Sequence, residues 1–341
     1  MKLDFGLGLG RHERMSELPE ITRVAEEGGY SFITFVDQPY MSPDPIVCMT
    51  IAAVNSRRLR IGQGVTDPIN YNSLVLANQA VSMTELTGGR FFVGIGAGGS
   101  YGKVQRPARV QELKDSVEFI REFTAGKVME WNGQEIQHET SRVKVPVYVA
   151  GGGPRSLELA GAIGDGALIM SGPPQFVKLK VDKIRQGAEK AGRDPDEVEI
   201  IVRQWIYPCE SKEKAFKEVA GCLTNHCGLP TLDLEHPDPE YRRLLKELED
   251  KEPGILAEIK KARDLWEPKY HEHPDGPHAL VSTQRMVDLV HLTGKEEDIL
   301  EGLNDLYEAG VRTVAPGTYT IIDKIGLIKE ISSKIMPHFR N

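Results

Sequence analysis

Apolar and polar positions follow two alternating patterns along this chain. Short, mostly apolar runs are each followed by a turn and by a longer segment whose apolar residues recur every three or four positions, the period of a helix with one buried face. The runs predicted as strands are Leu3–Leu9, Phe32–Val36, Arg60–Val65, Phe91–Ile95, Val145–Val149, Gly166–Met170, Val198–Ile206 and Thr313–Ala315. Eight strands that alternate with helices favour a closed (β/α)8 TIM barrel over an open doubly wound α/β sheet.

Hydroxyl side chains and glycines stand where the predicted helices should begin and end. Such residues are common at N-caps and just beyond helix C-termini, respectively. The expected pairs of cap and stop are Ser16 with Gly29, Ser73 with Gly88, and Thr283 with Gly294.

Two segments interrupt the alternation. Residues 127–143 contain an Asn-Gly turn between short alternating runs, which predicts a hairpin inserted after the fourth helix. Residues 222–278 are charged and helix-prone with proline-rich flanks, which predicts a helical excursion over the barrel mouth, since barrels differ mainly in the loops that follow their strands. We expect residues 1–341 to form a single domain, with a separate second domain as the alternative.

Composition narrows the class of protein. The 341 residues are 40% hydrophobic and 27% charged, which allows a large core. The net charge of −8 without a cluster of Lys or Arg argues against a nucleic acid or an anionic membrane as partner, and no apolar run suits a membrane span or a secretion signal. The four cysteines are scattered, so a cytoplasmic protein with free thiols that binds a small molecule is expected.

The most informative site is the sequence Gly151-Gly152-Gly153-Pro154 at the end of the fifth predicted strand. Glycines let backbone amides approach a ligand closely, and proline suits the first position of the helix that follows. A helix start of this kind binds anions, most often phosphate. The alternative is a tight strand-to-helix turn without a ligand.

Further candidates follow other strands. Gly96 and Gly98 leave room at the barrel mouth for a flat ring system, although a flexible loop is the alternative. Gly64 interrupts a strand, which suggests a bulge or a close ligand. Asp37 is a candidate for proton transfer or for bonding a cofactor, or else braces a loop. The other candidate cofactor contacts are Val65, Thr66, Ser171 and Gly172.

The histidines offer weaker signals. His12 follows the first strand, at the end of the barrel where catalysis is expected, so it is a second candidate for proton transfer, with a surface loop histidine as the alternative. The spacing of His271, His273 and His278 imposes no coordination geometry, and no metal site is predicted.

Three stretches together resemble one family. They are Glu85–Gly98 (ELTGGRFFVGIGAG), Gly62–Pro68 (GQGVTDP) and Ala150–Pro154 (AGGGP). They are similar to the bacterial-luciferase-like flavin and deazaflavin superfamily, above all to the branch that contains methylenetetrahydromethanopterin reductase. The resemblance covers residues 1–205 and resumes from 280.

This resemblance implies a dimeric (β/α)8 barrel that binds coenzyme F420, with FMN as the alternative. It implies a non-prolyl cis peptide at Gly64-Val65 that supports the back of the deazaflavin ring. It also implies that Gly151–Gly153 hold the phosphate of the cofactor and that Asp37 lies near the ring.

The chain also departs from that branch. Gly8 stands where the reductase carries a glutamate, and Gly99 or Ser100 where it carries an aspartate. We therefore expect F420-dependent hydride transfer to or from a small organic substrate other than the pterin. The alternatives are an FMN-dependent monooxygenase, a flavin-binding barrel without activity, and a phosphate-binding lyase or isomerase without a redox cofactor.

Overall fold

A computed structural model describes residues 1–10, 14–39, 41–98, 105–223, 229, 232, 234–236, 238–270, 272–318 and 323–340. Parallel strands form its centre, in the order β1-β13-β10-β9-β8-β5-β4-β3-β2. The strands are β1 (Asp4–Phe5), β2 (Leu7–Leu9), β3 (Phe32–Phe35), β4 (Arg60–Gln63), β5 (Phe91–Gly96), β8 (Val147–Ala150), β9 (Gly166–Met170), β10 (Glu199–Gln204) and β13 (Thr313–Pro316).

The two ends of this sheet meet. The strands β1 and β2 are consecutive parts of one N-terminal run separated by Gly6; β1 pairs with β13 and β2 pairs with β3. A further parallel bridge joins Gly8 to Gly317 just past β13. The sheet is therefore a closed barrel, and the predicted TIM-barrel fold is confirmed.

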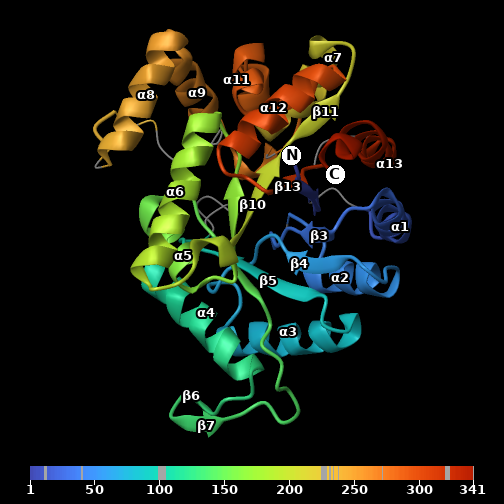
Figure 1. The fold of residues 1–341 in the computed structure, drawn as a ribbon, viewed down its shortest axis with the longest axis vertical. Coiled ribbons are helices and arrows are strands. Elements are labelled where there is room, and N and C mark those ends of the chain that lie inside the picture. The colour runs from blue at the N-terminus through green and yellow to red at the C-terminus, as the bar shows by residue number, and fades with distance from the viewer. Residues whose placement is uncertain are drawn as a thin grey trace.

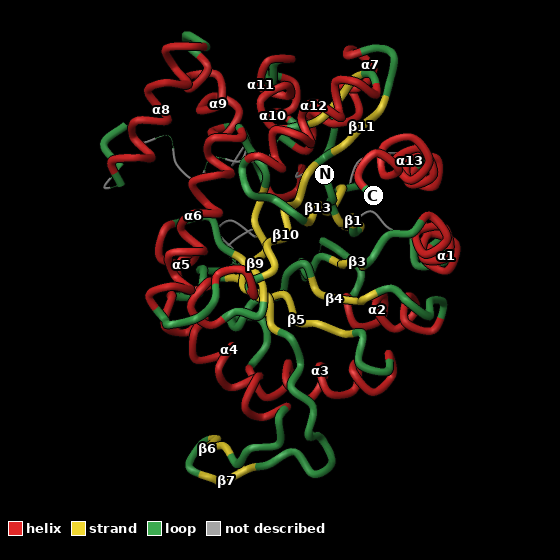
Figure 2. The backbone as a smooth tube through the Cα atoms, in the orientation of Figure 1, coloured by secondary structure: helices red, strands yellow, loops and turns green. Residues whose placement is uncertain are grey.

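Helices surround the barrel, as Figures 1 and 2 show. Those that follow barrel strands are α1 (Leu18–Gly28), α2 (Pro45–Val54), α3 (Ser73–Thr87), α4 (Val110–Thr124), α5 (Pro154–Ile163), α6 (Pro174–Lys190) and α13 (Lys324–Glu330), and α12 (Glu296–Glu308) precedes the last barrel strand, β13. Short helical turns are η1 (Pro195–Glu197), η2 (Ala220–Cys222), η3 (Pro268–Tyr270), η4 (Ile331–Ile335) and η5 (Met336–Phe339). The main core lies between the barrel and these helices.

Both predicted interruptions are present. A hairpin of β6 (Met129–Trp131) and β7 (Gln134–Ile136) follows α4 and extends below the barrel in Figure 1. The later excursion is helical, with α7 (Lys212–Val219) before it and α8 (Pro239–Lys251), α9 (Ile255–Asp264), α10 (Pro277–Leu280) and α11 (Gln284–Val290) along and after it. The described excursion packs in a second apolar cluster with Phe176 of α6 and Met286 of α11.

Several predicted boundaries were wrong. The run Val198–Ile206 is not one strand, because β10 ends at Gln204 and β11 (Ile206–Pro208) pairs instead with β12 (Leu292–Gly294), outside the barrel sheet. Gly294 lies in β12 rather than after a helix. The side chain of Asn72, not of Ser73, caps α3 by accepting from the Val75 N–H. Thr283 is the N-cap residue of α11, as predicted, although its side chain makes no cap bond; the N-cap of α1 is Glu17 rather than Ser16.

Aromatic rings fill the barrel interior. Phe32, Phe92 and Tyr148 form an interior cluster with Ile201 and Ala315. Glycines on the adjoining strands make room for these rings: a Cβ on Gly62, for example, would lie 2.3 Å from Cε2 of Phe92. Close packing of this kind leaves no channel through the middle of the barrel.

An ion pair fills the N-terminal end of the barrel. Arg60 Nη1 and Nη2 donate to the two carboxylate oxygens of Glu199 at 2.8 and 3.0 Å, and the Tyr148 hydroxyl donates to the same carboxylate at 2.6 Å. Despite burial, these bonds hold the pKa of Glu199 below its ordinary value. Since this end is occupied, a ligand would enter from the C-terminal end, as in other barrels of this type.

Candidate active site

The candidate residues gather at the C-terminal ends of the barrel strands. Asp37 follows β3, Thr66 follows β4, Gly96 ends β5, and the Gly151–Gly153 and Ser171-Gly172 segments follow β8 and β9. Backbone bonds join two of these ends directly: the Thr66 N–H donates to Gly94 O and the Gly96 N–H donates to Thr66 O, both at 2.9 Å. His12, Gly99, Ser100 and His271 lie outside the described residues.

A bulge follows β4, as the isolated glycine predicted. Gly62 is opposite Phe92, whereas Thr66 is opposite Ile95, so four residue steps on one strand face three on the other. The extra residue lies within Gln63-Gly64-Val65. The Gly64-Val65 peptide bond is cis. The bulge comes so close to β5 that a Cβ on Gly94 would lie 2.0 Å from the Gln63 carbonyl oxygen.

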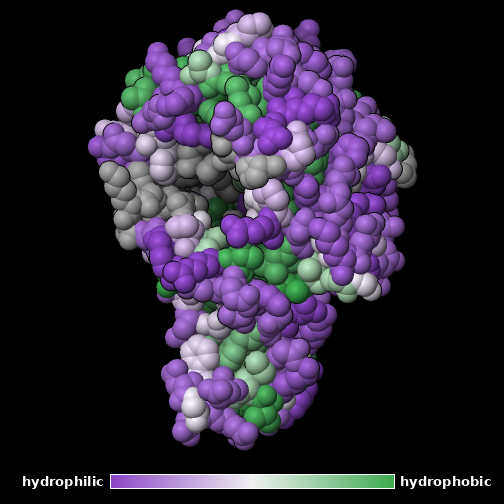
Figure 3. All heavy atoms as spheres, turned by 90° about the vertical axis from the view of Figure 1, so that its left-hand side faces the viewer, coloured by the Kyte–Doolittle hydropathy of each residue, from purple (hydrophilic) through white to green (hydrophobic). Residues whose placement is uncertain are grey.

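Apolar side chains beside this bulge remain accessible. Gly96 packs between Val65 and Ala150, and a Cβ on it would lie 3.2 Å from a carbon of each. On β9, Leu168 packs against the interior cluster; Met170, two residues on and therefore on the same face, is 38% exposed. Figure 3 shows a hollow, with hydrophobic side chains below it, in the face that lies to the left in Figure 1. An accessible apolar surface at this end suits a flat, partly apolar ligand.

Two buried carboxylates lie near the bulge in different environments. Asp67, 2% exposed, accepts hydrogen bonds from the backbone of Ile69 and Asn70 at 2.9 Å and from the Gln105 amide at 3.0 Å. Asp37, 3% exposed, accepts from the Tyr71 hydroxyl at 3.4 Å. The described donors to Asp67 come from the turn that follows β4 and from Gln105.

Burial raises the pKa of Asp37 to about 6. The nearby charge of Asp67 adds to this rise, while the hydroxyls of Thr66 and Tyr71 oppose it. Burial, followed by the charge of Asp37, raises the pKa of Tyr71 to about 12, so its hydroxyl keeps its proton. A carboxyl that titrates near neutrality at a barrel mouth suits a group that gives or takes a proton.

The start of α5 leaves room beside its first backbone N–H groups, and anion binding there stays a prediction. Gly153 is its N-cap, no side chain caps it, and a Cβ on Gly153 would meet nothing within 4 Å. The first turn carries no acidic residue. Glycine is needed at position 151 for a different reason: a Cβ there would lie 2.5 Å from the Ser156 hydroxyl. Only part of the glycine run is therefore left for a ligand.

Ser171 is more occupied within the protein than the sequence suggested. Its side chain is buried, its hydroxyl donates to the Gln204 amide oxygen, and its backbone N–H donates to Arg203 O at 2.9 Å. Its role as a cofactor contact stays a prediction, and the bonds that are present join β9 to β10.

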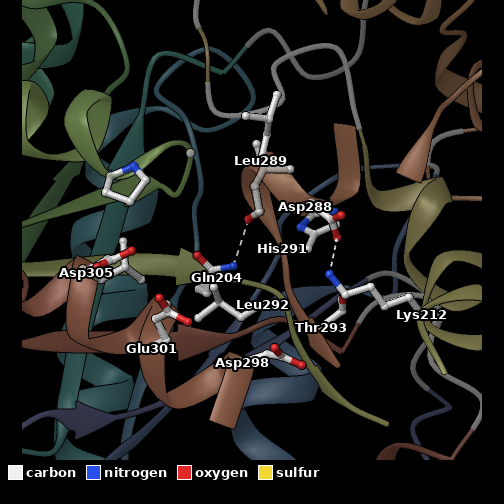
Figure 4. Close-up of a pocket in the computed structure, with 15 residues that line it drawn as sticks. Gln204, Lys212, Asp288, Leu289, His291, Leu292, Thr293, Asp298, Glu301 and Asp305 are labelled. Carbon is white, nitrogen blue, oxygen red and sulfur yellow. Dashed lines mark hydrogen bonds and ion pairs between the residues drawn. The ribbon is translucent and has the colours of Figure 1, made fainter. Parts of the chain in front are cut away.

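Gly172 lines a cavity of about 240 Å³ between the start of α6 and α12 (Figure 4). Gln204 also lines it, and because Gln204 alternates with the inward-facing Arg203, the cavity lies outside the barrel wall. Its polar lining includes the ion pair between Lys212 Nζ and Asp288 Oδ1, at 3.6 Å. This cavity is therefore distinct from the barrel mouth.

The other histidines have structural contacts. His278 is fully buried, with Nε2 3.1 Å from Gly221 O, and His273 Nδ1 accepts from the Asp275 N–H. Within the described ranges, no three His, Cys, Asp or Glu side chains are grouped as metal ligands would be. None of the helices that the structure describes has the length and hydrophobicity of a membrane span.

Arg203 is the polar residue of the mouth that the sequence reasoning missed. It lies in β10 on the same face as Ile201, is 7% exposed, and donates from Nη2 to Thr34 Oγ1 at 3.1 Å and to Gly64 O at 3.4 Å. The sequence contained one signal for this residue: Arg203 is a charged residue that directly follows the apolar run Ile200–Val202, at a position that alternation assigns to the inside of the barrel.

Known proteins share both the sequence and the fold. A sequence profile of the family described as luciferase-like monooxygenase matches residues 3–313. The chain belongs to this family. The 5,10-methylenetetrahydromethanopterin reductase of Archaeoglobus fulgidus is 25% identical to this luciferase-like chain over 352 residues, which cover 99% of this chain and 100% of the reductase. An F420-dependent glucose-6-phosphate dehydrogenase of Mycolicibacterium fortuitum is 30% identical over 211 residues, or 54% of this chain and 63% of the dehydrogenase.

Two solved structures share the whole fold of this luciferase-like protein. The F420-dependent tetrahydromethanopterin reductase of Methanopyrus kandleri superposes with a TM-score of 0.76, covering 99% of this chain and 100% of the other. An F420-dependent secondary alcohol dehydrogenase with an F420-acetone adduct superposes with a TM-score of 0.77 over 100% of both chains. Each is 20% identical. The protein is an oxidoreductase of this family, as predicted.

Proposed function

We propose that the protein is an F420-dependent oxidoreductase that transfers a hydride between the deazaflavin and a small organic substrate. The observation that carries the proposal is the bulge at Gln63-Gly64-Val65, which lies beside accessible apolar side chains and near the buried Asp37. Methylenetetrahydromethanopterin reductases of Archaeoglobus fulgidus and Methanolobus tindarius match 99% and 98% of the chain, which supports a deazaflavin as the cofactor.

The residues present fit such a cofactor. Val65 and Met170 offer apolar surface to a ring, and the start of α5 offers backbone N–H groups to a phosphate. F420 would supply the two-electron chemistry when bound. The protein would orient the substrate, keep water out and hold a proton on the carboxyl of Asp37. Both states of that carboxyl are accessible near neutral pH, because its pKa is raised to about 6.

The substrate is proposed to differ from the pterin, because Gly8 gives the first strand no acidic side chain at the mouth. Its Cα faces the Arg203 guanidinium: a Cβ on Gly8 would lie 1.5 Å from Nη1. A glutamate could not occupy this position without displacing Arg203. His12 remains a second candidate for proton transfer. We also propose the homodimer that the family resemblance implies, and the cytoplasmic location that the scattered cysteines predict.

Titration of the purified protein with F420, FMN and riboflavin tests the proposal. We expect F420 to bind most tightly, as judged by the change in its fluorescence. Tight binding of FMN with oxygen consumption would instead favour the monooxygenase, which is the second candidate because of the family described as luciferase-like monooxygenase. Failure of all three compounds to bind would refute both functions.

Gly153 offers a sharper test of the phosphate position. Aspartate and asparagine are similar in size and both cap helices well, and a Cβ at position 153 would meet no atom within 4 Å. Gly153→Asp should weaken binding of phosphate-bearing cofactors at least tenfold by charge repulsion, whereas Gly153→Asn should change it little. Riboflavin, which lacks the phosphate, should not distinguish the two variants. Equal binding of F420 to both would place its phosphate elsewhere.

A further inference from the structure

The Arg203 side chain crosses the barrel interior beneath the mouth. Its strand, β10, pairs only with β9 and β13 in the barrel, yet its Nη2 reaches Thr34 on β3 and the Gly64 carbonyl of the bulge after β4. Its register partner on β9 is the accessible Met170. The guanidinium therefore lies directly on the interior side of the bulge.

Two glycines leave the space that the guanidinium fills. A Cβ on Gly8 would lie 1.5 Å from Nη1 and 2.2 Å from Cζ of Arg203, and a Cβ on Gly64 would lie 2.9 Å from Nη2. Any other residue at position 8 would push the side chain away. The position of this charge is thus fixed by contacts with β2, β3 and the bulge after β4, and by its own strand, β10.

We propose that Arg203 is a tuning residue that raises the reduction potential of the cofactor bound against the bulge. The proposal rests on the proposed function, since it needs a flavin-type ring at Gly64-Val65. Arg203 is not a catalytic residue in this view. It acts through its electric field and through the Gly64 carbonyl to which it donates.

The sign follows from charge. Two-electron reduction of a flavin-type ring gives a form that readily carries a negative charge, and a nearby cation favours the more negative form. A unit charge within several ångströms changes such an equilibrium on the order of tenfold, which is about 30 mV for a two-electron couple.

The barrel contains a matched control. Arg60 also points into the interior, but from the N-terminal end, where it is paired with Glu199. Replacing it removes an equal charge from the opposite end of the same barrel. Arg203→Gln and Arg60→Gln therefore separate the field at the mouth from general effects of losing an interior arginine.

The experiment measures the potential of bound F420, and of bound FMN if that is the tighter ligand, by equilibrating the holoprotein with redox dyes. We expect Arg203→Gln to lower the potential by about 30 mV, a tenfold change in the reduction equilibrium. Arg203→Lys, which keeps the charge, should stay near wild type, and Arg60→Gln should not change the potential. Gly8→Ala, which displaces the guanidinium without removing it, should give a shift in the same direction and serves if Arg203→Gln does not fold.

Two failures are distinguishable. If the wild-type protein binds neither cofactor, the proposed function fails and this inference falls with it. If the cofactor binds and Arg203→Gln or Gly8→Ala leaves its potential unchanged, or Arg60→Gln shifts it equally, the tuning role alone is overturned. If Arg203 had only a structural role, Arg203→Gln would lower the stability of the protein, and Arg203→Lys would not restore the wild-type reduction potential.

Discussion

Replacing Asp37 by asparagine should stabilise the protein at high pH. The carboxyl of Asp37 is 3% exposed, and burial raises its pKa from 3.8 to about 6. A group that binds its proton more tightly in the folded state favours folding below the unfolded pKa, and this contribution is lost as the pH rises through the folded pKa. The shift corresponds to about 3 kcal/mol, at about 1.4 kcal/mol for each pKa unit. Asparagine has no such proton to lose.

The assay is urea denaturation of both proteins at pH 4.5 and pH 8. About 2 kcal/mol of the difference should develop between these pH values, with the asparagine variant gaining relative to wild type. Comparing the two pH values cancels any constant effect of the substitution. A difference in unfolding free energy that stays the same at both pH values would refute the reasoning, because the carboxyl would then titrate alike in the folded and unfolded states.

The neighbouring carboxylate provides the control. Asp67 accepts hydrogen bonds from two backbone N–H groups and from the Gln105 amide, and bonds to a charged acceptor are stronger than bonds to a neutral one. Asp67→Asn should therefore destabilise the protein at pH 8, by about 1 to 3 kcal/mol, as expected for weakening hydrogen bonds to a buried charged group. The structure therefore predicts that replacing Asp37 by asparagine raises the stability of the protein at pH 8 relative to its value at pH 4.5, whereas replacing Asp67 by asparagine lowers the stability at pH 8. A gain in stability at pH 8 for Asp67→Asn would contradict the stabilising effect expected of these hydrogen bonds.

Three further predictions concern packing and activity. Gly62→Ala should lower the free energy of unfolding by about 1 to 3 kcal/mol because its Cβ would lie 2.3 Å from the Phe92 ring, and adding Phe92→Leu should restore part of this loss. If urea denaturation shows no loss for Gly62→Ala, the ring does not pack against this position. Gly98→Ala should lower the melting temperature more than Gly88→Ala: both glycines have positive φ (72° and 63°), but only a Cβ at Gly98 would meet Asp67, at 2.9 Å. Equal melting temperatures of the two variants would contradict a clash with Asp67. If the reaction uses protonated Asp37, kcat/KM should fall above about pH 6, and a flat profile would exclude it as the donor.

The overall fold was predictable because it depends on periodicity. Each predicted run overlaps a barrel strand, and the residues that end α1 and α3 are the glycines expected. The errors come from interactions that periodicity does not encode. Trp205 continues an apolar run in the sequence, but β11 pairs with β12 and leaves the barrel there. The choice of Asn72 over Ser73 as a cap depends on one residue of helix register.

The chemistry at the mouth was predictable only in part. Asp37 and Asp67 both follow strands and look alike in sequence, and only the described donors around Asp67 separate their roles. Arg203 stands out only when its side chain is known to point inward, and its contacts come from β3 and from the bulge after β4, far away in the sequence. Contacts between distant strands are what a single sequence does not display.

Glycine is therefore needed at the barrel mouth for two separate reasons. The sequence suggested that they leave space for a flat cofactor, but several leave space for the protein's own groups: Gly8 for Arg203, Gly98 for Asp67 and Gly94 for the Gln63 carbonyl. The cofactor is proposed to use what remains, which includes the open Cα of Gly153 and the accessible surface of Met170. A glycine-rich barrel mouth is thus evidence for fixed charges and a close bulge as much as for a ligand. Substitutions at Gly8 and Gly98 should therefore displace charged side chains of the protein itself, whereas a Cβ at Gly153 meets no protein atom within 4 Å and should affect the bound ligand alone.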